Sequence, residues 1–240
     1  MTTALISEDI KNSLQNFLGE NTPSELINTY LFFIEKRFRL KPVLFPKHKV
    51  IYQSAEDAIK KVEDKGELYH EAEIKISFSK EAVNDHTRKI YICPFTGKVF
   101  GDNTHPNPQD AIYDWVSKCP ENTERSGGLR VKRFFVSEDP EVIKSYMEKQ
   151  QNKEPITKTV YSSVLSGKIF ASKQAVIDDF KKSYLKPMTM IEVQNQNRYE
   201  IEGSFLDFIQ GQLVEEKVAA FLEAMAEYSE FRPHVERWLS

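Results

Sequence analysis

YICPFTGKVFGDNTHPNPQDAIYDWVSKC, residues 91–119, is the stretch from which the fold can be predicted. Residues 91–93 favour a strand, 94–97 a tight turn, and 98–100 a return strand. Proline early and glycine late suit such a turn, because proline presets φ and glycine tolerates a positive φ. An amphipathic helix is predicted to begin at Gln109.

The same pattern returns elsewhere in the chain. YICPFTGKVF (91–100) aligns with YSSVLSGKIF (161–170), and VLFPKHKVIY (43–52) forms a fainter third copy. A helix is expected after each hairpin, followed by a strand-like run at 68–78, 129–136 or 188–193. The predicted unit is hairpin, helix, strand, repeated within about 42–80, 88–137 and 158–194, which is typical of internal duplication.

The fold class predicted from these patterns is α+β. An N-terminal helical pair (1–41) precedes the repeated ββαβ region (42–202), which we expect to form a mixed sheet. A long C-terminal helix and tail (203–240) follow. Pro120 to Gly128 is expected to be a loop, and a helix is expected from Pro140 to about Gln151.

The C-terminal helix is predicted to be an oligomerisation element. Its apolar face changes sides between its first and second halves, so a helix of this kind either kinks or packs between two bodies. A homo-oligomer is therefore expected, and its interface would be formed by Val218, Phe221, Leu222, Met225 and Tyr228.

Composition excludes several classes of protein. The chain has 240 residues, a net charge of −3 and two cysteines. No run reaches the roughly 18 apolar residues of a spanning helix, and the N-terminus lacks the pattern of a cleaved signal. These features predict a protein of a reducing compartment, and a protein exported by a route without a cleaved signal would share them.

A basic run is the candidate site for an anionic partner. It comprises Lys36, Arg37, Arg39, Lys41, Lys47 and Lys49. Clustered cations contact anionic lipid or an acidic partner, and the interleaved Phe38 and Phe45 also suit single-stranded nucleic acid. A solvated helix end explains the same residues, because cations favour the C-terminal dipole. The balanced net charge leads us to expect no nucleic-acid partner.

Cys93 is the centre of the competing hypothesis, a thiol- or metal-dependent enzyme. Cys93, His105, Cys119 and His86 could be arranged as a zinc site, although the paired spacing of zinc ligands is missing. Cys93 to Thr96 resembles a monothiol Cys-x-x-Cys, but a strand follows it instead of a helix. A Cys93–Cys119 disulfide stays open. No serine-hydrolase elbow or phosphate loop occurs, so we expect no catalytic residues, metal or cofactor.

RKIYICPFTGKVFGDNTHPNPQDAIYDWVSKCPEN, residues 88–122, resembles a conserved chlamydial protein family associated with type III secretion. The resemblance covers essentially the whole chain. It implies a soluble, oligomer-forming interaction protein of the bacterial cytoplasm, or one exported without a cleaved signal, with secretion-apparatus proteins or lipid as partners. No catalytic residues are carried over from the family. The apolar stripe of the predicted C-terminal helix keeps no heptad register, which favours an accessory role over that of a needle tip.

Overall fold

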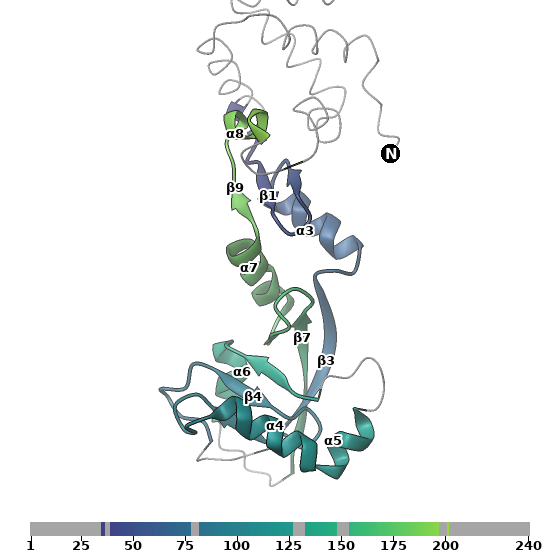
Figure 1. Cartoon of the computed structure of the whole chain (residues 1–240), viewed down its shortest axis with the longest axis vertical. Coiled ribbons are helices and arrows are strands. Elements are labelled where there is room, and N and C mark those ends of the chain that lie inside the picture. Colours follow the sequence, from purple (N-terminus) through teal and green to yellow (C-terminus); the bar gives the residue numbers. More distant parts are fainter. Residues whose placement is uncertain are drawn as a thin grey trace, which may run out of the picture. The chain divides into compact units, whose positions relative to one another are not determined.

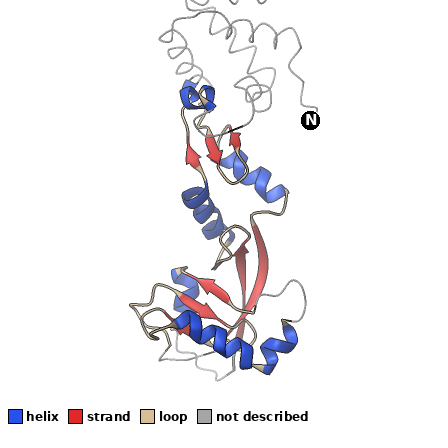
Figure 2. Ribbon diagram, viewed as in Figure 1, coloured by secondary structure: helices blue, strands red, loops and turns tan. Residues whose placement is uncertain are grey.

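The computed structural model describes residues 35–36, 39–77, 82–126, 133–147, 154–196 and 201. Its α+β class agrees with the prediction, as Figures 1 and 2 show. The described strands form three separate antiparallel sheets rather than one mixed sheet. Arg37 and all five predicted interface residues, Val218, Phe221, Leu222, Met225 and Tyr228, lie outside the described residues.

The order hairpin, helix, strand occurs three times. β1 (Val43–Phe45) and β2 (Val50–Tyr52) precede α3 (Ala55–Asp64) and β3 (Tyr69–Ile76). β4 (Ile90–Ile92) and β5 (Val99–Gly101) precede α4 (Pro108–Lys118), α5 (Pro120–Arg125) and β6 (Phe135–Ser137). β7 (Ile156–Ser163) and β8 (Ile169–Phe170) precede α7 (Lys173–Tyr184) and β9 (Lys186–Pro187).

Three local expectations were wrong. Residues 120–125 form the helix α5, because Pro120 occupies the first helical turn, where its missing N–H costs nothing. Only Lys186 and Pro187 form the strand β9; Met190–Gln194 is the helix α8, which Thr189 and Glu192 begin with a capping box. The helix after Pro140, α6 (Pro140–Ser145), ends well before Gln151.

The second and third hairpin turns have closely similar backbones, and the first shares one left-handed position with them. The N–H of Gly97 donates to the carbonyl of Cys93 at 2.9 Å, and Gly167 donates to Ser163 at the same distance. Each glycine has a positive φ, 73° and 69°, and the equivalent Lys49 in the first hairpin has a φ of 52°. All three turns therefore place a residue with a left-handed backbone at the same position, and in the first turn that residue is a lysine instead of a glycine. Descent of the three units from one duplicated ancestor stays a prediction.

Each sheet consists of one hairpin and one strand that follows a helix. The orders are β2-β1-β9, β8-β7-β3 and β5-β4-β6. In the third sheet, β6 closes the hairpin of its own unit. In the other two the closing strands are exchanged: β3, after the first helix, pairs with β7, and β9, after the third helix, pairs with β1.

The chain divides into two compact units. One comprises residues 1–61 and 181–240, and the other comprises residues 62–180. The second unit contains the sheets β8-β7-β3 and β5-β4-β6 and a core of twelve buried side chains, which include Ile74, Ile92 and Val160. The opposite face of the sheet β5-β4-β6 packs against α4 through Tyr91, Cys93, Ile112 and Val116. None of the described helices is long and apolar enough to cross a bilayer.

Candidate functional site: an open strand edge

The two sheets of the second unit are joined on one side through β6 and β8. Val136 bridges Lys168 in parallel, and the Ser137 hydroxyl donates to the carbonyl of Ile169 at 2.8 Å. Asp139 caps α6 by accepting from the N–H of Glu141, and it also accepts from the N–H of Ala171 at 2.7 Å. These contacts give a continuous strand sequence, β5-β4-β6 followed by β8-β7-β3.

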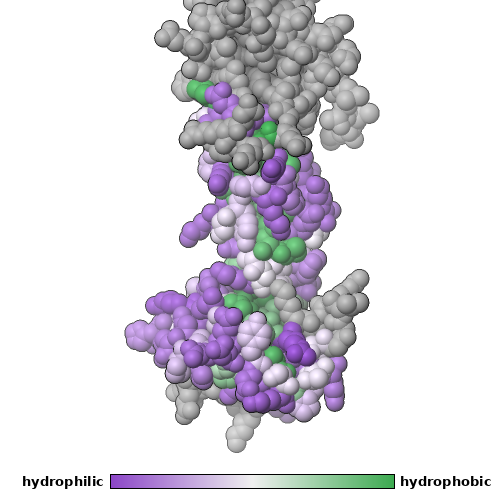
Figure 3. All heavy atoms as spheres, in the orientation of Figure 1, coloured by the Kyte–Doolittle hydropathy of each residue, from purple (hydrophilic) through white to green (hydrophobic). Residues whose placement is uncertain are grey.

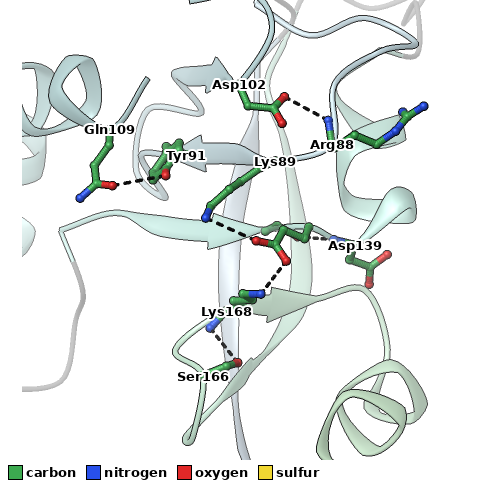
Figure 4. A network of polar contacts seen from close by, with 10 residues as sticks. Arg88, Lys89, Tyr91, Asp102, Gln109, Asp139, Ser166 and Lys168 are labelled. Atoms are coloured by element: carbon green, nitrogen blue, oxygen red, sulfur yellow. Dashed lines mark hydrogen bonds and ion pairs between the residues drawn. The ribbon is translucent and has the colours of Figure 1, made fainter. Parts of the chain in front are cut away.

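A charged network reinforces this junction. Lys168 and Lys89 both contact the carboxylate of Glu138, with N–O distances of 2.5 and 3.4 Å. Figure 4 shows the side chains of Lys89 and Lys168 pointing toward one carboxylate between them. The hydrogen bond from Lys168 lowers the pKa of Glu138 below its ordinary value of 4.5. The three side chains are 31–41% exposed, so water screens these ion pairs and they contribute little free energy individually.

The strand sequence ends at β3, whose outer edge meets the β4–β5 turn only in part. The N–H of Lys75 donates to the carbonyl of Pro94 at 2.9 Å, and the carbonyl of Lys75 accepts from the buried Tyr146 hydroxyl at 2.9 Å. Gly97 lies against the same edge: a Cβ placed on it would be 2.7 Å from the N of Ser77. The edge is therefore closed at residues 75–77.

The outer edge of β3 is open at Glu73, two residues before Lys75. Backbone groups of an antiparallel strand point alternately to its two sides. Lys75 points away from β7, so Glu73 and Glu71, at two-residue spacing, point away as well. Among the described residues, no hydrogen bond reaches the N–H or carbonyl of Glu71 or Glu73 on that side.

A cavity of about 460 Å³ lies at this open edge. Its size falls within the usual range of ligand pockets. Its lining combines two acidic side chains with apolar ones and consists of Glu71, Ala72, Glu73, Pro94, Phe95, Phe135 and Thr159. The space-filling view in Figure 3 shows small apolar areas between hydrophilic ones on the visible surface of this unit.

The predicted basic run is divided by the structure. Arg39 and Lys41 lie before β1, whereas Lys47 and Lys49 lie in the β1–β2 turn at the other end of the hairpin. All four are exposed. Arg39 has a φ of 50° because it ends a helical turn: its N–H donates to Lys36, and the N–H of Leu40 donates to Glu35. Lys36 is exposed in that same helical turn.

Cys93 is fully buried between the β4–β5 hairpin, α4 and α5. The Asn122 amide donates to its sulfur at 3.3 Å and to the carbonyl of Arg133. Both cysteines are free thiols. His105 stacks edge-on against Phe100, and His86 lies in an exposed turn. Within the described ranges, no three His, Cys, Asp or Glu side chains are grouped to hold a metal ion.

The sequence analysis did not identify the open edge. The alternation of Glu71 and Glu73 with Ala72 and Ile74 correctly predicted a strand with one wet face. This alternation shows which face of the strand is wet, but it does not show whether the edge of the strand is paired. Whether the edge of a strand is paired depends on segments distant in the sequence, here Pro94 and Tyr146, so no local signal was available.

Comparison with known proteins places the chain in a family. A family model described as "Protein of unknown function (DUF2709)" matches residues 4–240. An uncharacterized protein of Chlamydia trachomatis serovar D is 51% identical over 234 residues, which cover 98% of each chain. Proteins of Chlamydia pneumoniae and Chlamydia muridarum are each 50% identical over the same coverage. No solved structure matches the chain. The chain belongs to this conserved family, DUF2709, which is represented in several Chlamydia species.

Proposed function

We propose that this protein is a non-catalytic interaction protein that binds an extended segment of a partner at the open edge of β3. The observation that supports the proposal is the pair of outward-facing backbone positions, Glu71 and Glu73, beside a cavity. Strand addition of this kind takes its affinity from backbone hydrogen bonds and its specificity from pockets for alternate side chains.

The competing hypothesis of an enzyme centred on Cys93 has less support. Its thiol is 0% exposed, and the backbone of β4 and the amide of Asn122 surround it. A reactive cysteine needs a partly exposed, electropositive environment that lowers its pKa. A buried strand cysteine that packs against Ile112 and Val116 fulfils a structural role instead.

An accessory role in type III secretion remains a further proposal, and only the sequence resemblance supports it. Anionic lipid as a partner is also a proposal, supported by the exposed Lys47 and Lys49 in one turn, whereas Arg39 and Lys41 lie at the other end of that hairpin. Self-association through the C-terminal helix is likewise proposed from the apolar pattern of residues 218–228.

The proposal is tested by screening a display library of random seven-residue peptides against the full chain and two variants. Glu73→Pro removes the outward N–H, and its ring obstructs an incoming strand, yet no hydrogen bond to β7 is lost. Glu73→Gln removes the same charge but keeps the edge. We expect enriched peptides with the wild type and with Glu73→Gln but none with Glu73→Pro.

Circular dichroism checks that each variant is folded. Peptides that are retained equally by a folded Glu73→Pro variant would show that the edge is not the binding site. A wild type that enriches no peptide at all would also contradict the proposed function.

A further inference from the structure

We infer that the bound segment has the pattern basic–apolar–basic at three consecutive positions. This inference rests on the proposed function and specifies its partner. It follows from the two faces of β3. Glu71 and Glu73 point to the wet face, whereas Ala72 points to the opposite face, where it packs on the core cluster that contains Phe135.

An added strand would repeat this alternation. Residues directly opposite each other on neighbouring strands have their side chains on the same face, with Cβ atoms about 4.5–5.5 Å apart. The two segment residues opposite Glu71 and Glu73 would therefore lie beside carboxylates. The residue between them would point to the other face, towards Ala72 and Phe135, which line the cavity.

The acidic side chains are available for such pairing. Glu73 makes no ion pair or hydrogen bond with any other described residue. Among the described residues, Glu71 makes a single ion pair, with Lys173 at 3.9 Å, and the two side chains are 62% and 52% exposed. A pair this long and this exposed is weak, so a cation opposite Glu71 can replace Lys173 at little cost.

The length of the segment is limited by the closed part of the edge. Lys75 already uses its N–H for Pro94 and its carbonyl for Tyr146. A segment can therefore pair at Glu71 and Glu73 but cannot continue past them in that direction. Three consecutive residues span the two outward-facing positions that carry a carboxylate, Glu71 and Glu73, which is why the pattern has three members.

A second copy of this chain is a poor occupant. An antiparallel pairing of two β3 edges centred on Glu71, Ala72 or Glu73 would bring a glutamate opposite a glutamate. Like charges directly opposite each other destabilise a strand pair. The charge of this edge therefore favours a cationic segment over the β3 edge of a second copy.

Synthetic peptides test the pattern. The basic peptide is Gly-Ser-Lys-Val-Lys-Ser-Gly, and its acidic counterpart has glutamate in place of both lysines. A third peptide, Gly-Ser-Val-Lys-Lys-Ser-Gly, has the composition of the first but cannot place both lysines on one face. Each carries a fluorophore, and fluorescence anisotropy measures its binding to the full chain.

We expect the basic peptide to bind at least about tenfold more tightly than either of the other two, equal to about 1.4 kcal/mol. The preference over the acidic peptide should weaken at high salt, because the carboxylates are exposed. The double variant Glu71→Lys/Glu73→Lys should reverse the preference and select the acidic peptide. The double variant to glutamine should bind both peptides alike.

Different results would contradict the open edge as the binding site and the basic–apolar–basic pattern of the segment. If all three peptides bind the wild type equally and none binds Glu73→Pro, the pattern is wrong and the open edge remains the binding site. If Glu73→Pro binds the basic peptide as tightly as the wild type does, binding occurs elsewhere and both are wrong. A dimer of the wild type that Glu73→Pro dissociates would make a second copy the occupant and contradict the inferred partner.

Discussion

Tyr146 determines, at the scale of one residue, where the edge of β3 closes. Its side chain is 2% exposed, and its hydroxyl donates to the carbonyl of Lys75. Burial raises the pKa of Tyr146 far above its ordinary value of 10.0, so the hydroxyl keeps its proton and donates at neutral pH. Two residues away, the carbonyl of Glu73 has no such partner among the described residues. One tyrosine thus separates a paired from an unpaired position on the same strand.

The Tyr146→Phe variant should lose about 1 to 3 kcal/mol of unfolding free energy. The carbonyl of Lys75 would lose its hydroxyl donor in a partly buried place, and such an unsatisfied group is costly. Urea denaturation measures the change. Tyr113→Phe is the control, because Tyr113 is 53% exposed, and it should change stability by less than about 0.5 kcal/mol. Equal effects of the two substitutions would contradict this role of Tyr146.

The three hairpins show, at the scale of the element, how one turn conformation is reached with different residues. The fourth turn residue has a positive φ in every copy, at Lys49, Gly97 and Gly167. Glycine adopts this conformation freely, whereas a residue with a Cβ pays about 1–2 kcal/mol. The first hairpin therefore carries backbone strain that the other two avoid.

Lys49→Gly should raise the unfolding free energy by about 0.5 to 1 kcal/mol, because the strain at the turn is larger than the entropy that glycine adds to the unfolded chain. Lys47→Gly is a matched control: it removes the same charge from the same turn at a residue without a positive φ. This control should lower stability by about 0.5 to 1 kcal/mol. Thermal unfolding measures the stability of both variants. A Lys49→Gly variant less stable than the wild type would be evidence against strain at Lys49.

At the scale of the whole molecule, the exchange of closing strands builds the first compact unit from two parts of the chain that are distant in sequence. The chain leaves the first unit near Lys61 in α3, returns near Lys181 in α7, and pairs β9 with β1 on its return. Residues 186–187 are needed to complete the sheet that begins at Val43. Neither end of the chain can therefore form this sheet without the other.

Self-association also belongs to this scale and is tested by light scattering. We expect the wild type to be a discrete oligomer and the variant Phe221→Glu/Met225→Glu to be a folded monomer, because two carboxylates in an apolar interface cost more than the contacts they replace. Tyr228→Phe is the control and should leave the mass unchanged. A monomeric wild type would refute the expected interface.

Much of the fold could be predicted because its signals are local. Pro94 and Gly97 predict the turn of the second hairpin, and Gly167 predicts that of the third. The aligned pairs Tyr91–Phe100 and Tyr161–Phe170 are indeed opposite each other in their hairpins. Alternation from His70 to Ile76 predicts the strand and its faces. In each case φ preference or periodicity acts within about ten residues.

The sequence by itself determined the three hairpins, the helices α3, α4 and α7 and the α+β class, since these depend on short-range backbone preferences. Only the tertiary structure decided which strand closes each sheet, that Cys93 lies beneath Asn122, and that β3 is paired at Lys75 but open at Glu73. The physical reason is that strand pairing and burial join segments distant in the sequence, such as Val43 and Pro187. Any strand with suitable alternation could pair with a free edge. Which strand does so therefore depends on the packing of the whole core.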